Sequence, residues 1–223
     1  MKKILLPSLA FLLLSLVSWK MFAPQTNGMV VHLKMSSSKG TSGNITIYYD
    51  TPGSRIEIAA TMGAFSITKA SIVKKAEPSI VYQLDEKSKT YSTVDVSNAE
   101  TDKVDEPATA TLIGTELLNE YSCKHVKIIQ GEKKWEMWVT TSIAEYTQFS
   151  AVVNKARYIG NHGVHVALKA INAEGFPVKT ILTDTDGTTT TALTGIERKP
   201  LSAALFAIPA DYKKGAPAPA HQH

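Results

Sequence analysis

Cysteine is almost absent from this chain of 223 residues, which contains only Cys123. A single cysteine cannot form an intramolecular disulfide, so the fold must be stabilised by its apolar core. A reactive thiol needs an electropositive, partly exposed setting. The adjacent Lys124 would point to the opposite face of a strand, so we interpret Cys123 as a buried structural residue.

Long apolar segments are also scarce. A mean hydropathy of −0.06 and one apolar run, residues 4–17, exclude a protein with several membrane spans. The run follows Lys2-Lys3 and is shorter than the ~20 residues of a transmembrane helix, which is typical of a secretory signal peptide. We predict a signal peptide over residues 1–23 and a periplasmic or otherwise exported location. A retained anchor is the alternative, because Met21 and Pro24 fit a cleavage site poorly.

The chain also has no large excess of positive or negative charge. The net charge is +4, from 24 basic and 20 acidic residues, but three of the lysines lie in the predicted leader. Without them the charges nearly balance, so the composition gives no electrostatic basis for a nucleic-acid partner. With 43% hydrophobic and 20% charged residues, the chain can bury a core, which excludes disorder over its full length.

Catalytic and cofactor motifs are missing. The sequence contains neither a G-x-S-x-G elbow nor an H-E-x-x-H, Walker or G-x-G-x-x-G motif. His162 and His165 supply too few ligands for zinc, as do His221 and His223 in the tail. We therefore predict a protein that is not an enzyme, with no catalytic residue, metal site or cofactor. A hydrolase or metalloenzyme is a third possibility, which would need acidic or histidine side chains converging on Cys123 or His165.

Period-two alternation of apolar and polar residues dominates what is present, with turn residues between the segments. Short connections favour antiparallel pairing, because parallel strands need long crossovers. Residues 98–107 are rich in acids and are interpreted as a solvated loop. The segments with strand character are 28–35, 45–49, 56–58, 61–73, 80–84, 90–94, 122–129, 133–140, 162–171, 176–184 and 188–196.

One segment has a helical pattern. Ser142 and Glu145 have the spacing of a capping box, and a 3.6-residue stripe follows through Ile143, Tyr146, Phe149, Val153 and Ala156. A short helical turn over 202–205, capped by Ser202, and a flexible tail over 215–223 complete the prediction. We expect a mainly β (α+β) single domain over 24–214, in which a curved antiparallel half-barrel sheet of about ten strands wraps around one main helix.

Aromatic and large apolar residues gather on that helix and on one predicted strand. A strongly curved sheet with a single helix is difficult to fill with side chains, so these residues are candidates for the lining of an apolar cavity. An ordinary packed core is the alternative. The candidates are Trp135, Met137, Trp138, Tyr146, Phe149, Val153 and Phe65.

The order of several short motifs resembles a known family. A Tyr82-Gln83-Leu84-Asp85 hairpin precedes Tyr121-Ser122-Cys123-Lys124, a Trp135-x-x-Trp138 strand that runs into a helix, and a closing Leu205-Phe206-x-Ile208-Pro209. This order resembles a family of uncharacterised exported bacterial domains whose architecture is similar to the LolA/LolB lipoprotein carriers. The resemblance implies an open antiparallel half-barrel around helices, with an apolar cavity able to hold acyl chains. No segment matches the motifs by which such carriers dock to their partners.

These observations together favour an exported, non-enzymatic binding protein. Its expected ligand is a lipid or lipidated chain in the concave face of the sheet, such as a lipoprotein acyl chain, with peripheral contact to envelope membranes. The alternative is a structural or interaction module of the cell envelope with a filled core.

Overall fold

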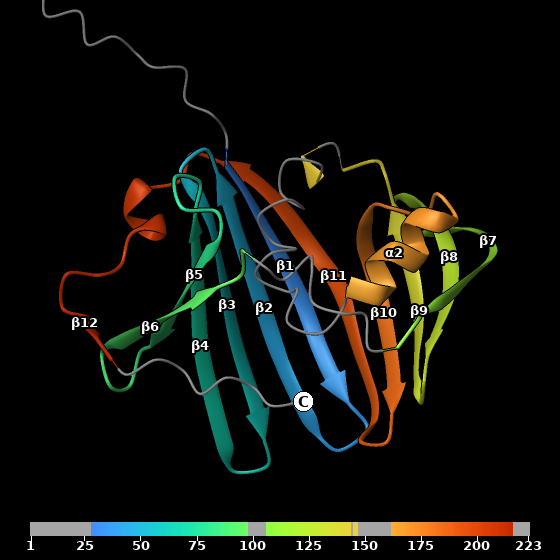
Figure 1. Ribbon diagram of the computed structural model, residues 1–223, viewed down its shortest axis with the longest axis horizontal. Helices are drawn as coiled ribbons and strands as arrows, with labels where there is room; N and C mark the ends of the chain where they lie inside the picture. The colour runs from blue at the N-terminus through green and yellow to red at the C-terminus, as the bar shows by residue number, and fades with distance from the viewer. Residues whose placement is uncertain (1–27, 98–105, 144, 147–161, 216–223) are drawn as a thin grey trace, which may run out of the picture.

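The structure, a computed structural model, describes residues 28–97, 106–143, 145–146 and 162–215. The described strands form one curved sheet of twelve (Figure 1). The strands are β1 (Gly28–Ser37), β2 (Thr41–Asp50), β3 (Gly53–Met62), β4 (Phe65–Lys74), β5 (Ile80–Asp85), β6 (Thr90–Asp95), β7 (Thr109–Leu118), β8 (Tyr121–Gln130), β9 (Lys133–Thr140), β10 (Phe176–Asp184), β11 (Gly187–Lys199) and β12 (Lys213–Lys214). The helices are α2 (His162–Ala170) and the 3₁₀ turn η1 (Ala203–Phe206).

Two antiparallel meanders make up the sheet. Strands β1 to β6 lie in sequence order on one side, and β7 to β11 lie in sequence order on the other. Pairing of β1 with β11 joins the two halves over ten residue pairs. The short β12 adds to the edge of β6 in the parallel direction. The predicted mainly β architecture with a curved antiparallel sheet is therefore confirmed, with twelve strands instead of about ten.

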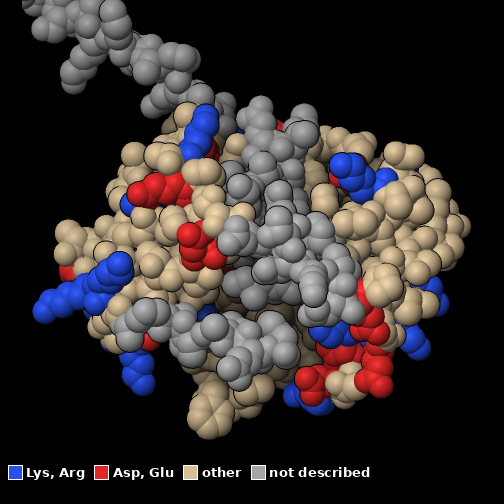
Figure 2. Space-filling view, in the orientation of Figure 1, with Lys and Arg blue, Asp and Glu red and all other residues tan. Residues whose placement is uncertain are grey.

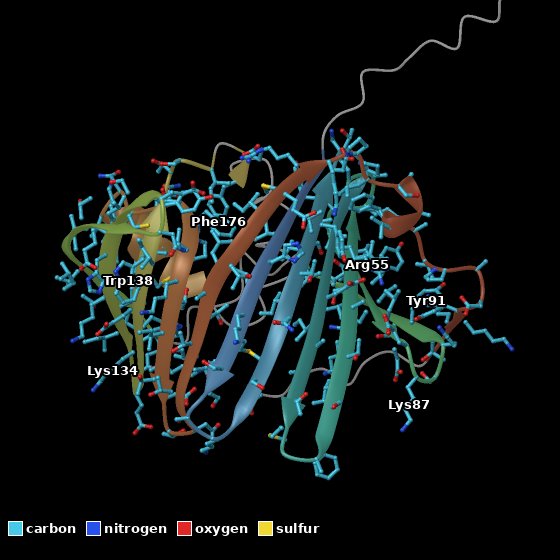
Figure 3. All side chains as sticks on the ribbon, turned by 180° about the vertical axis from the view of Figure 1, so that it is seen from behind. Arg55, Lys87, Tyr91, Lys134, Trp138 and Phe176 are labelled. Atoms are coloured by element: carbon cyan, nitrogen blue, oxygen red, sulfur yellow. The ribbon has the colours of Figure 1, made fainter. Side chains whose placement is uncertain are left out.

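The two faces of the sheet can be followed by register, because directly paired residues lie on the same face. Val164, Ala167 and Leu168 of α2 pack against one face at β8 and β9. Met137 of β9 lies beneath this cluster, and pairing through Thr180 and Thr191 connects it to Met35 of β1. We call this the inner face, and the opposite one, seen in Figure 3, the outer face.

The predicted strand at 162–171 is wrong, because His162–Ala170 forms the helix α2. Val164, Val166 and Leu168 alternate as in a strand, but Val164, Ala167 and Leu168 also have the spacing of one helix face. The structure buries the second set and leaves Val166 49% exposed. The main helix that we predicted over 142–156 falls largely outside the described residues, as do the signal peptide and nearly all of the tail.

Strand β7 was not predicted, and a bulge explains why. The register with β8 shifts between Leu112 and Gly114, which places one extra residue in β7 and interrupts its alternation. The irregular segment 61–73 proves to be a hairpin, in which Gly63 adopts φ +58° at the turn between β3 and β4. The capped turn at 202–205 is confirmed: the Ser202 hydroxyl accepts a hydrogen bond from the Ala204 N–H at 3.3 Å.

Candidate functional site

An apolar ladder crosses the inner face over four neighbouring strands. Val31 of β1 pairs with Ile196 on one side and Ile47 on the other, and Ile47 pairs with Ile56. A second row in the same register consists of Leu193, Leu33, Ile45 and Ile58. Val31, Leu33 and Ile47 are between 0% and 4% exposed. The curve of the sheet therefore carries a continuous apolar surface that is buried at Val31, Leu33, Ile47 and Leu193 and half-buried at its other four residues.

The α2 end of the inner face holds two of the predicted site residues. Trp135 is buried in a cluster with Val164 and Leu168 of the helix, and the half-buried Met137 packs against that cluster. The cross-strand partners of Trp135 are Ile128 and Leu182, so the indole is surrounded by aliphatic side chains. This part of the face is apolar and is covered by α2, a segment that we had predicted to be a strand.

Trp138 does not lie in the α2 cluster that contains Trp135. It lies three residues further along β9, so it points to the opposite side of that strand from Trp135, and it is part of the buried cluster that contains Val31 and Leu33. Its ring stacks on His125 with centroids 4.2 Å apart. The Lys179 ammonium lies 4.7 Å from the indole centroid. The indole Nε1–H donates to Glu116 at 2.9 Å, and His125 contacts the same carboxylate at 2.7 Å. The structure therefore separates the two tryptophans, which we had expected to line one cavity.

The carboxylate of Glu116 is held ionised by these neighbours. The hydrogen bond from Trp138 is the main cause of its lowered pKa, and the bond with His125 adds to it. Cys123 lies on the same strand face as His125 but is fully buried, and burial raises the pKa of its thiol. Its thiol donates only to the Tyr121 carbonyl. The arrangement fits a structural cysteine, as predicted, and a polar cluster that fixes the Trp138 ring.

The remaining predicted site residues are scattered. Tyr146 packs edge-on against Phe176, with ring centroids 5.7 Å apart, in the cluster that contains the inner-face residues of β1. Phe65 lies at the tip of the β3–β4 hairpin and is 72% exposed, so the structure does not bring it to the tryptophans. Phe149 and Val153 lie outside the described residues.

Polar groups are few beside the apolar ladder near Val31 and Ile47, whereas the inner face becomes polar at Thr180 and Thr191. Ser54 pairs with Tyr49 on the inner side, and its hydroxyl is buried without a hydrogen-bond partner. Burial raises the pKa of Tyr49, with a smaller contribution from Asp50. A polar ligand would find little here to bind, whereas an apolar one would match the surface.

A surface depression of about 320 Å³ lies at the far ends of β1 to β4. Its lining is dominated by small polar side chains, so it does not match the apolar ligand that the sequence predicted. The polar lining residues are Lys34, Ser42, Asn44, Thr61, Ser66 and Thr68.

Within the described part of the chain, no three His, Cys, Asp or Glu side chains gather where they could hold a metal ion. None of the described helices is long and apolar enough to cross a membrane.

Comparison with known proteins identifies the family. A model of the family described as "Domain of unknown function (DUF4412)" matches residues 27–212. The chain belongs to this family. The resemblance that we inferred to a family of uncharacterised domains is thereby confirmed. No curated protein is similar to the chain in sequence.

Several solved structures are similar to this DUF4412 member. An uncharacterized conserved protein from Thermus thermophilus has a TM-score of 0.51 and 11% identity over 85% of this chain and 90% of that one. PNGF-II has a TM-score of 0.47 and 12% identity, with 85% of this chain covering 31% of that one. A LolA superfamily protein from Nitrosomonas europaea has a TM-score of 0.32 and 10% identity over 82% of this chain and 91% of that one.

Sequence reasoning missed the centre of the apolar face. Val31 and Leu33 alternate with His32 and Lys34 in β1, and Ile45 and Ile47 alternate with Asn44 and Thr46 in β2. This alternation predicted strands correctly, but it does not show which strands become neighbours. We selected candidates in β9 instead, because its tryptophans are large and aromatic, but this strand lies at one end of the face.

Proposed function

We propose that this protein is an exported, non-enzymatic binding protein that holds a lipid or a lipidated chain against the inner face of its sheet. The observation that carries the proposal is the apolar ladder of β11, β1, β2 and β3, in which Ile45, Ile56, Ile58 and Ile196 are only half-buried beside the buried Val31 and Ile47. An acyl chain is the ligand class that such a surface suits, because it offers dispersion and hydrophobic contacts and almost no hydrogen-bonding groups.

Binding of this kind depends on buried apolar area. At about 25 cal/mol per Å², a single acyl chain reaches micromolar affinity only where the cavity is largely preformed. A curved sheet braced by α2 at one end supports such preformation. The predicted signal peptide over residues 1–23 would deliver the protein to the cell envelope, where lipids and lipoproteins are available.

Two matched variants test where the ligand lies. Ile45 and Thr46 are adjacent in β2, both half-buried, and point to the inner and outer faces respectively. Ile45→Trp fills space on the inner face, so we expect uptake of a fluorescent fatty acid to fall at least about tenfold, the equivalent of about 1.4 kcal/mol. Thr46→Trp should bind like the wild type.

The outcomes separate the proposal from its rival. Equal uptake by both variants would move the ligand off the inner face. No uptake by the wild-type protein would favour a structural module of the envelope with a filled interior.

A further inference from the structure

Lys69 of β4 places a single charge on an otherwise neutral part of the inner face. No bulge interrupts the pairing of β3 with β4, so Lys69 lies directly opposite Ile58 and on the same face as that residue. Every other inner-face position of β1 to β4 holds an uncharged residue. A lysine at this place is therefore an exception to the pattern of the face.

The Lys69 ammonium is exposed and has no counter-charge in the part of the chain that the structure describes. Residues 58–68 contain no charged residue, and the tip of the β3–β4 hairpin, at the lower edge of Figure 2, shows none either. Among the described residues, no acidic side chain forms an ion pair with Lys69.

Asp85 is the acid nearest to Lys69 in register, because extending the β4–β5 pairing by one residue places the two opposite each other. Its carboxylate instead accepts the N–H groups of Lys87 and Ser88, at 2.9 and 3.0 Å. Asp85 is thus engaged in the turn between β5 and β6. The Lys69 ammonium remains available to an anion from outside the chain.

Lys69 stands at the end of one row of the apolar ladder. The row of Leu193, Leu33, Ile45 and Ile58 continues in direct register to Lys69. With neighbouring strands about 4.8 Å apart, this row spans about 19 Å, a distance that an extended long acyl chain can follow. The row presents aliphatic side chains along its length and a cation at its end.

The neighbouring row also becomes polar at β4. It passes through Ile47 and Ile56 to Ser71, and Ser71 pairs with Gln83 of β5. Ser71 and Gln83 are half-buried. A hydroxyl and an amide can donate hydrogen bonds to an anion that the Lys69 ammonium attracts. Both rows of the ladder therefore end at the same strand in groups that suit an anionic head group.

The geometry points to an acyl chain with an anionic head group as the ligand. Its head group lies at Lys69, Ser71 and Gln83, and its hydrocarbon chain follows the row from Ile58 to Leu193. This orientation rests on the proposed function of the inner face and adds the charge and direction of the ligand to it. A carboxylate and a phosphate share the required chemistry, so a free fatty acid and a phospholipid are the two sources.

Head-group preference tests the proposal independently of overall affinity. Palmitate, hexadecyl phosphate and hexadecanol carry chains of equal length and are competed against a neutral hydrophobic dye on the purified full chain. We expect at least one anion to bind about fivefold or more tightly than the alcohol, because hydrogen bonds to charged groups are stronger than neutral ones. The tighter anion identifies the source as carboxylate or phosphate.

Matched lysine variants assign the preference to one side chain. Lys69→Met removes the charge and nearly retains the length, so it should bind the anions and the alcohol equally, whereas Lys69→Arg should keep the preference. Lys34→Met removes an exposed lysine from the outer face and should behave like the wild type.

The outcomes separate this inference from the function on which it rests. A wild-type protein that binds hexadecanol as tightly as both anions would overturn the head-group assignment and leave acyl binding intact. A preference that survives in Lys69→Met would also overturn it and would assign Lys69 to protection of the open end of β4 against pairing with another chain. A wild-type protein that binds none of the three compounds contradicts acyl binding itself.

Discussion

The two faces of strands β1 and β2 are built from alternating residues of the same segments, yet they have different chemistry. The inner residues Val31, Leu33 and Ile47 are aliphatic and buried. The outer face carries ion pairs such as His32 with Glu197 at 3.1 Å and Arg55 with Glu57 at 2.7 Å. An exposed pair such as His32–Glu197 needs no cover, whereas a wide aliphatic surface must be covered by the protein or by a ligand.

This difference indicates where stability and binding reside. Burial of the aliphatic residues of the inner face contributes hydrophobic stabilisation, and on the outer face the buried cluster of Ala70, Ile72 and Leu84 contributes as well. The same kind of substitution should therefore change the free energy of unfolding by different amounts on the two faces. We expect the largest change on the inner face.

Leu33 and Lys34 give the strongest contrast, because they are adjacent in β1 and point to opposite faces. Leu33→Ala should lower the free energy of unfolding by about 2–5 kcal/mol, through lost burial and the cavity left behind. Lys34→Ala, an exposed outer residue, should stay within about 0.5 kcal/mol of the wild type. Urea unfolding measures both values. Equal losses would show that the inner face is not the core of the fold.

Trp138→Phe tests the polar cluster around Glu116. It removes the hydrogen bond to Glu116 and should lower the stability measured at neutral pH. The folded-state pKa of Glu116 lies below its unfolded value, so its stabilising contribution is present above about pH 4.5 and is lost as the pH falls through the folded-state pKa.

The pH profile identifies the cause. In Trp138→Phe, unfolding followed at several acidic pH values should show a smaller loss of stability than in the wild type. The matched Trp135→Phe, on the inner face, leaves the bonds of Glu116 intact and should keep the wild-type dependence. A full acid-dependent loss in Trp138→Phe would contradict this assignment.

The smallest effect is expected at the margin of the inner face, where Arg198 donates to both oxygens of Glu145, at 2.6 and 3.2 Å. These bonds lower the pKa of Glu145. Because both side chains are partly exposed, Arg198→Ala should cost less than about 1 kcal/mol. The cost should shrink in high salt and disappear below the folded-state pKa of Glu145. Thermal unfolding at two salt concentrations checks this, and a cost independent of salt would argue for packing instead.

The fold was largely predictable because alternation and turn chemistry are local signals. The strand at 133–140 and the Ser202 cap could be predicted in this way. The helix α2 could not, since Val164 and Leu168 fit both periods and tertiary packing decided between them. Strand β7 was missed because its bulge at Ile113 breaks the alternation.

The candidate site was less accessible to sequence reasoning. The pairing of β1 with β11 brings Val31 next to Ile196, 165 positions later, and nothing local predicts that contact. Trp135 and Trp138 were treated as one group on their proximity in sequence, although a separation of three residues in a strand places them on opposite faces. Applying the two-residue repeat of a strand to these two tryptophans would have placed them on opposite sides of β9.

Lipid content is the most direct test of the account. The full chain is expressed, purified without detergent and extracted with organic solvent, and the extract is examined by mass spectrometry. An apolar inner face that binds acyl chains predicts co-purified lipid at a fixed ratio to protein, reduced in Ile45→Trp and unchanged in Thr46→Trp. An extract free of lipid, from a protein that also takes up no fluorescent fatty acid, would contradict it.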